Sequence, residues 1–155
     1  MRTELAFAFP LEPAGAGGRA LVVNGVVDVH AVEEDRVLIV DYKSDRLEGS
    51  DPAALTEAAY GTQRIVYALA ALRAGAPLVE VDHCYLERPD APVAATFEAG
   101  DLPSLEARLL ELAEGVTSWR FEPTSNPHRG LCGDCPGQPG LCSWGPERTL
   151  APEPA

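Results

Sequence analysis

Two valine-rich runs, Ala20–His30 (ALVVNGVVDVH) and Arg36–Lys43 (RVLIVDYK), lie on either side of the acidic segment Glu33–Asp35. Runs of β-branched residues are typical of strands, and a polar turn between two such runs predicts an antiparallel hairpin. The second run ends abruptly in charged residues. Because strand residues two apart share a face, Asp41 and Lys43 should point the same way, with Tyr42 opposite.

The segments around this hairpin predict a sheet flanked by helices. A helix rich in alanine and leucine is expected over Pro52–Ala74, capped by Asp51 and stopped at Gly75. Asp101 is expected to cap a second amphipathic helix. Further strands are predicted at Leu5–Pro10, Val79–Leu86 and Val93–Phe97. The order β-β-β-α-β-β-α predicts an α/β (α+β) fold with a central mixed sheet.

Composition limits the classes of protein that fit. The 155 residues suit one domain, and 46% hydrophobic residues suffice for a core. The 12 Lys+Arg and 24 Asp+Glu give a net charge of −12, which argues against a free-standing nucleic-acid binder that works through a basic patch. No apolar run reaches the roughly eighteen residues of a membrane span, and the first residues do not resemble a secretory signal, so a cytoplasmic protein is expected. No phosphate-loop motif is present, so nucleotide hydrolysis is not expected.

Acidic residues interrupt the apolar pattern at Asp28 and Asp41. If the two runs pair, these carboxylates come close together, where they repel each other unless a divalent cation lies between them. Lys43 on the same face can orient a water and stabilise charge that develops on a phosphate. Gln63 and Tyr67, four residues apart on the helix, share a face and would position a polar substrate. For Asp41 and Lys43 alone, an ion pair at a strand end is the simpler explanation; the full set favours a site.

Taken in order, the segments Gly25-Val-Val-Asp28, Ile39-Val-Asp41-Tyr-Lys43-Ser-Asp45 and Gln63-Arg-Ile-Val-Tyr67 resemble the PD-(D/E)XK nuclease superfamily. More narrowly, they resemble the C-terminal nuclease domain of RecB- and AddA-type helicase–nucleases. The resemblance implies a restriction-endonuclease-like core, which we place at residues 1–120, followed by a cysteine-containing tail at residues 121–155.

The resemblance also implies roles for individual residues. Asp28, Asp41 and the backbone carbonyl of Tyr42 would bind Mg²⁺ or Mn²⁺, and Lys43 would be the catalytic lysine. Gln63 and Tyr67 would complete the catalytic set, lining the site and contacting DNA or fixing the metal ligands. Independently of the resemblance, a small number of hard oxygen ligands from the protein suits Mg²⁺, because water and phosphate complete its coordination shell.

The implied function is hydrolysis of DNA phosphodiester bonds by an exonuclease module that works with a helicase domain or subunit in recombination and break repair. An acidic chain should bind DNA weakly by itself, which favours such a larger machine. Two other functions stay open. One is a non-catalytic relative that binds DNA or serves a structural role, although the intact Asp/Asp/Lys set favours an enzyme. The other is a small metal-binding interaction domain carried by the cysteine tail.

Three of the four cysteines, Cys132, Cys135 and Cys142, are clustered in the Pro- and Gly-rich tail. In a reducing compartment such clustering favours a metal over disulfides. Some superfamily relatives hold an iron–sulfur cluster with one cysteine before the core and three after it, but here no cysteine precedes the core. Zinc bound by the three cysteines and His128 is an alternative, and three reduced thiols without metal is another. Cys84 is expected to be a small core residue.

Overall fold

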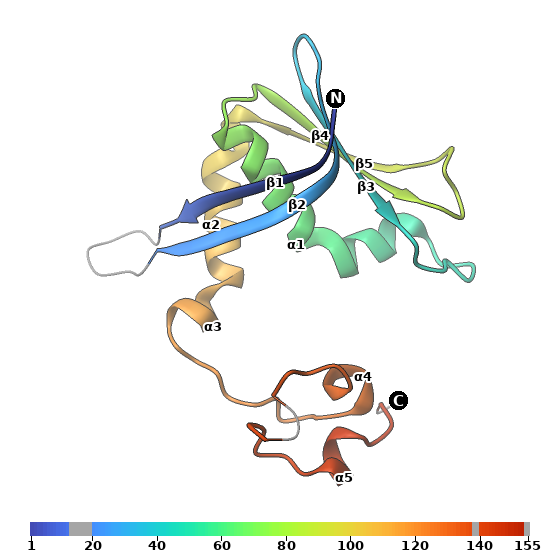
Figure 1. Ribbon diagram of the computed structural model, residues 1–155, viewed down its shortest axis with the longest axis vertical. Coiled ribbons are helices and arrows are strands. Elements are labelled where there is room, and N and C mark those ends of the chain that lie inside the picture. The colour runs from blue at the N-terminus through green and yellow to red at the C-terminus, as the bar shows by residue number, and fades with distance from the viewer. Residues whose placement is uncertain (13–19, 138–139, 154–155) are drawn as a thin grey trace. The chain divides into compact units, whose positions relative to one another are not determined.

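The computed structural model describes residues 1–12, 20–137 and 140–153. The chain forms two compact units, Met1–Thr117 and Ser118–Ala155. In the first unit, five strands form one sheet in the order β1-β2-β3-β4-β5 (Figure 1). The predicted packing of residues 121–155 on or beyond the core stays a prediction.

The sheet is mixed, as predicted. Strands β1 to β3 are antiparallel neighbours, β3 and β4 are parallel, and β4 and β5 are antiparallel. The expected hairpin is confirmed, with Val29 opposite Val40 in the β2–β3 ladder. The strand bounds are β1 (Arg2–Leu11), β2 (Leu21–Val32), β3 (Val37–Lys43), β4 (Leu78–Tyr85) and β5 (Val93–Glu98).

Helix α1 (Pro52–Arg73) connects the two parallel strands. It begins where the sequence predicts, because the Asp51 side chain accepts a hydrogen bond from the Ala53 N–H. It ends just before Gly75, whose φ of +97° is a conformation that glycine adopts without steric cost.

Helix α2 (Leu102–Leu112) follows β5 after the 3₁₀ turn η1 (Ala99–Asp101), and α3 (Glu114–Thr117) closes the first unit. The prediction that Asp101 caps α2 is confirmed for its position but not for a bond from its side chain. Asp101 occupies the N-cap position, but its carboxylate accepts the Glu98 N–H at 2.8 Å. The η1 turn offers this nearer donor, so the carboxylate stabilises the turn and not the helix.

Both long helices pack on one face of the sheet (Figure 1). Ala68 and Leu72 of α1 contact the strands there, and Leu69 of α1 meets Leu109 of α2 over β1. Cys84 is not in this core, so that prediction is wrong. It is half-buried on the other face of β4, because the odd-numbered residues of that strand face α1.

The second unit contains two one-turn helices, α4 (Arg129–Cys132) and α5 (Pro146–Thr149). The Arg129 N–H donates to the carbonyl of Ala151, and the indole N–H of Trp144 donates to the carbonyl of Thr124 at 2.8 Å. Within the described ranges of the chain, no helix combines the length and apolar character needed to cross a membrane.

Candidate functional site

The parallel pairing of β3 and β4 brings the carboxyl ends of both strands to one edge of the sheet. In this register Asp41 lies beside His83, and Lys43 lies beside Tyr85. All four residues are buried, whereas Tyr42 points to the opposite, exposed face. The predicted sharing of a face by Asp41 and Lys43 is therefore confirmed.

Lys43, the only lysine of the chain, is held by three groups. Its Nζ lies 2.5 Å from Oδ2 of Asp41, donates to Oε1 of Gln63 at 2.7 Å, and lies 3.6 Å from the centroid of the Tyr60 ring. A carboxylate, an amide oxygen and an aromatic face together offset the desolvation of the buried ammonium. These contacts fix the ammonium at the end of β3.

Gln63 and Tyr67 of α1 both reach Asp41, as their shared helix face predicts. The Tyr67 hydroxyl lies 3.0 Å from Oδ1 of Asp41 and 3.1 Å from the carbonyl of Val26. Nε2 of Gln63 donates to that hydroxyl at 2.9 Å and lies 3.4 Å from the same carboxylate oxygen. Burial, together with the charge of Asp41, raises the pKa of Tyr67, so this side chain stays a neutral donor.

Asp28 joins this group from the neighbouring strand β2. Its Oδ2 accepts a hydrogen bond from the backbone N–H of Tyr42 at 2.8 Å. Asp28 directly precedes Val29, which pairs with Val40 in the ladder. The charge of Asp28 also contributes to the raised pKa of Tyr67. The structure thus places Asp28, Asp41 and the backbone of Tyr42 next to one another, as the hairpin predicts.

The glycine of the Gly25-Val-Val-Asp28 segment has a packing reason. A Cβ at Gly25 would lie 2.7 Å from Cζ of Phe7, so any side chain there would displace that ring. Phe7 in turn makes an edge-to-face contact with the ring of Tyr67, with centroids 6.0 Å apart. Gly25 therefore lets the ring that supports Tyr67 lie flat on β2.

The donor set at this edge fits a small, hard cation. Oδ2 of Asp41 is buried, and its contact among the described residues is the ion pair with the ammonium of Lys43. Two carboxylates and a backbone carbonyl are oxygen ligands of the kind that Mg²⁺ and Mn²⁺ accept, with water and substrate phosphate filling the other positions. Where the chain is described, no three His, Cys, Asp or Glu side chains form a complete cage.

Three residues around the site escaped the sequence prediction: Tyr60, Arg64 and His83. Tyr60 donates to Oδ2 of Asp45 at 2.7 Å, a bond that with burial raises its pKa to about 12, and its ring stacks on His83. Burial lowers the pKa of His83 to about 4, so the imidazole adds no charge beside Asp41 at neutral pH. The sequence feature that could have identified Tyr60 as a site residue is its helical spacing, three residues before Gln63 and seven before Tyr67.

Cys132, Cys135 and Cys142 of the second unit form no disulfide with one another or with the other described residues. Cys132 is buried, Cys142 is half-buried and Cys135 is exposed, and the Cys135 N–H donates to the Cys132 carbonyl at 3.2 Å. Nδ1 of His128 is buried without a hydrogen-bond partner among the described residues. No three such ligands converge in the described part of this unit, so the iron–sulfur or zinc site stays a prediction.

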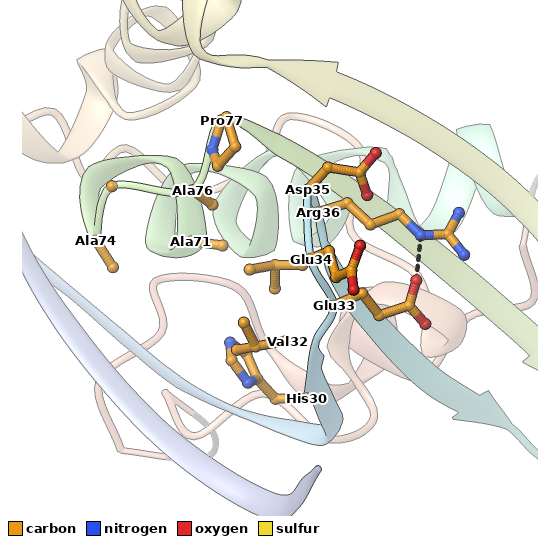
Figure 2. Close-up of a pocket in the computed structure, with 12 residues that line it drawn as sticks. His30, Val32, Glu33, Glu34, Asp35, Arg36, Ala71, Ala74, Ala76 and Pro77 are labelled. Atoms are coloured by element: carbon orange, nitrogen blue, oxygen red, sulfur yellow. Dashed lines mark hydrogen bonds and ion pairs between the residues drawn. The ribbon is translucent and has the colours of Figure 1, made fainter.

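A separate hollow of about 320 Å³ lies at the β2–β3 turn, beside the end of α1 (Figure 2). The acidic residues of the turn and Arg36 form one wall, where Arg36 is bonded to Glu33. Ala71 of α1, together with Ala74 and Ala76 just beyond the end of that helix, forms another. Its lining includes none of the predicted site residues. The hollow is at the amino end of β3, and the site is at the carboxyl end.

Comparison with known proteins agrees with this geometry. The solved structure of SSO0001 is similar to this chain with a TM-score of 0.50 and 18% sequence identity, a likeness that shows the fold alone. The match covers 86% of this chain and 56% of that one, so this chain spans little more than half the length of that structure. No curated protein matches in sequence. The family model of the PD-(D/E)XK nuclease superfamily matches residues 1–140, which include every residue of the site at the β3 edge, and the chain belongs to that superfamily.

Proposed function

We propose that the protein is a deoxyribonuclease that uses Mg²⁺ or Mn²⁺ to hydrolyse phosphodiester bonds, acting as an exonuclease. The observation that carries the proposal is the convergence of Asp28, Asp41 and Lys43 at one sheet edge, with Gln63 and Tyr67 bonded to that group. Membership of a nuclease superfamily supports the same chemistry.

In the proposed mechanism, Asp28, Asp41 and the Tyr42 carbonyl would hold the cation. Such a cation would supply a more acidic water and would stabilise negative charge on the phosphate oxygens. Lys43 can only donate hydrogen bonds, so its ammonium orients the attacking water and the phosphate oxygens. Gln63 and Tyr60 limit the positions of that ammonium, and Tyr67 fixes the direction of the Asp41 carboxylate. The oxygen of water bonds to phosphorus as the bond to the leaving oxygen breaks, the water gives a proton to solvent and the leaving oxygen takes one up from solvent, without a covalent intermediate on the protein.

The proposal extends to a partner. The resemblance of the three motifs to RecB- and AddA-type nuclease domains supports a helicase domain or subunit that feeds DNA ends to the site during recombination and repair. The net charge of −12 supports the same arrangement, because an acidic protein gains from having the strand delivered.

Cys132, Cys135 and Cys142 are proposed as ligands of an iron–sulfur cluster or of zinc, on the basis of their spacing. Elemental analysis of protein purified without oxygen tests this directly. We expect about one iron–sulfur cluster, detected as iron with inorganic sulfide, or about one zinc ion per chain. Cys132→Ser should lose this metal. Protein that carries neither metal would contradict the assignment.

The nuclease assignment is tested with linear DNA labelled at either end, incubated with Mg²⁺ or with EDTA. We expect Mg²⁺-dependent release of short products, and a rate about 10²- to 10³-fold lower for Lys43→Gln. Arg36→Gln is the matched control, since it removes one positive charge at the opposite end of β3 and should keep the wild-type rate. Wild-type protein that binds DNA without cleaving it would favour the non-catalytic alternative.

A further inference from the structure

Arg64, which follows Gln63 on α1, is a largely buried cation without a full set of partners. Its side chain is 13% exposed, and its Nε and Nη2 atoms are buried without a hydrogen-bond partner among the described residues. Among the described residues its ion-pair contact is to Glu57, 3.7 Å from Nη1, and that carboxylate is 79% exposed. A guanidinium removed from water normally has its donors satisfied, so this one is poised to receive an anion.

Arg64 borders a groove of about 550 Å³ between α1, α2 and β5. The volume lies within the range of roughly 300–1,000 Å³ that is usual for ligand sites. Arg108 of α2 supplies a second positive charge on the groove, and Phe97 and Leu105 supply apolar walls. The groove thus combines two guanidinium groups with an apolar surface, which suits a ligand that has both an anionic and a flat apolar part.

Gly61 keeps the helix side of this groove open. Glycine in the interior of a helix destabilises it relative to alanine, so its presence usually has a packing or ligand reason. Here a Cβ at Gly61 would meet only the Glu57 side chain, at an ordinary distance of 3.5 Å. Packing within the described chain therefore does not demand glycine, and a close approach by a ligand explains it.

The carboxylates near the two arginines are exchangeable. Glu57 is mostly exposed, and Glu111, which lies 2.6 Å from Arg108, is 70% exposed. An ion pair whose carboxylate is exposed to water contributes little to stability, so a phosphate can replace either carboxylate. The groove also adjoins the site along α1, because Arg64 directly follows Gln63, whose side chain accepts a hydrogen bond from Lys43.

We propose that the groove of Arg64 and Arg108 binds a nucleotide unit of the substrate strand beyond the one that is cleaved, with its phosphate on the guanidinium groups and its base on the apolar wall. The inference deepens the proposed function and rests on it for the identity of the strand. In a chain with twice as many acidic as basic residues, these two arginines supply local attraction for the backbone next to the acidic centre.

The test measures binding separately from cleavage. The anisotropy of a fluorescent single-stranded oligonucleotide is followed in EDTA over a series of salt concentrations, where no hydrolysis takes place. Arg64→Gln should weaken binding about 10-fold and reduce the slope of log K against log salt by about 0.7. Arg64→Lys should keep the slope but recover only part of the affinity, because an ammonium lacks the planar fork. Arg36→Gln, at the far end of β3, should bind like the wild type.

Two further variants keep the test decisive if Arg64→Gln does not fold. Arg108→Gln changes a side chain that is 53% exposed and should also reduce the salt slope. Gly61→Leu should raise the melting temperature through helix propensity while weakening oligonucleotide binding, a combination that damage to the fold cannot produce.

An unchanged affinity and slope in Arg64→Gln, or equal weakening in Arg36→Gln, would overturn the inference. So would a groove that binds a free mononucleotide in an Arg64-dependent way while oligonucleotide binding is unaffected. Absence of Mg²⁺-dependent cleavage by a wild-type protein whose binding still depends on Arg64 would contradict the proposed nuclease function and leave the groove in place.

Discussion

Tyr60 is one of the two α1 residues, with Gln63, that contact Lys43 and limit its position. Its ring lies under the ammonium, its hydroxyl is tied to Asp45, and its other neighbour is the neutral ring of His83. A cation over an aromatic face gains about 0.5–2 kcal/mol, the larger values applying where water is excluded. The ring therefore favours one position of the ammonium without offering it an acceptor that competes with the substrate.

The contact of Lys43 with Tyr60 predicts a spectroscopic signature. Because Lys43 is the only lysine, protein labelled with ¹³C-lysine gives one ε-methylene signal. The ring current of Tyr60 should shift it upfield. Tyr60→Phe should keep this shift and most of the nuclease activity, while Tyr60→Leu should lose both. Identical lysine spectra for all three proteins would contradict the contact.

His83 predicts a pH dependence of stability. Its pKa is about 4 in the folded protein, against 6.5 for the free side chain. The unfolded chain therefore binds a proton that the folded chain refuses, so stability is present above pH 6.5 and decreases as the pH falls toward 4. Urea unfolding in EDTA should show a loss of about 2 kcal/mol between pH 7 and pH 5.

The matched variant is His83→Phe, which fills the same buried position without a titrating group. Between pH 7 and pH 5 its free energy of unfolding should fall by about 2 kcal/mol less than that of the wild type. A wild-type protein whose free energy of unfolding is flat across this interval would show that His83 is not held neutral.

At the scale of elements, local periodicity predicted most of the site. The two-residue period of β3 placed Asp41 and Lys43 on one face, and the helical period of α1 placed Gln63 and Tyr67 together. The hairpin then brought Asp28 beside Tyr42. These relations lie within one element or between adjacent ones, where spacing alone determines which side chains meet.

Long-range pairing was not predictable in the same way. His83 lies beside Asp41 only because β4 pairs with β3 in parallel across the whole of α1, in a register that no turn sets. That register also decides which face of β4 points to α1, and so explains why Cys84 is outside the core. To predict the groove of Arg64 and Arg108, the position of α2 must be known, and that position follows from packing and not from residue spacing.

Ala68 tests how closely α1 must approach the sheet to hold the site. The residue is fully buried between the helix and the strands, so Ala68→Leu should overpack the core and lower the free energy of unfolding by about 1–3 kcal/mol. Ala54→Leu, the same change at an exposed position of the same helix, should alter it by less than about 0.5 kcal/mol. Equal stabilities in urea unfolding would contradict the packing of α1 described above.

At the scale of the whole molecule, the excess of acidic residues has a consequence for metal binding. Asp28 and Asp41 carry like charges at one edge of an acidic protein, so a divalent cation should stabilise the fold as well as support cleavage. At about 100 times its dissociation constant, such a cation adds roughly 2.7 kcal/mol. The melting temperature should therefore rise with Mg²⁺ in the wild type but not in Asp28→Asn. A rise of equal size in both proteins would place the cation elsewhere.

The central claim is that the acidic and basic groups at the end of β3 cleave DNA. The most direct measurement is the rate of Mg²⁺-dependent degradation of linear DNA by Asp41→Asn, compared with Asp82→Asn. Asp82 provides the matched control, because it lies on the next strand but on the other face of the sheet. We predict that Asp82→Asn degrades DNA like the wild type, and that folded Asp41→Asn is slower by about 10²-fold or more. Full activity in Asp41→Asn would contradict the account.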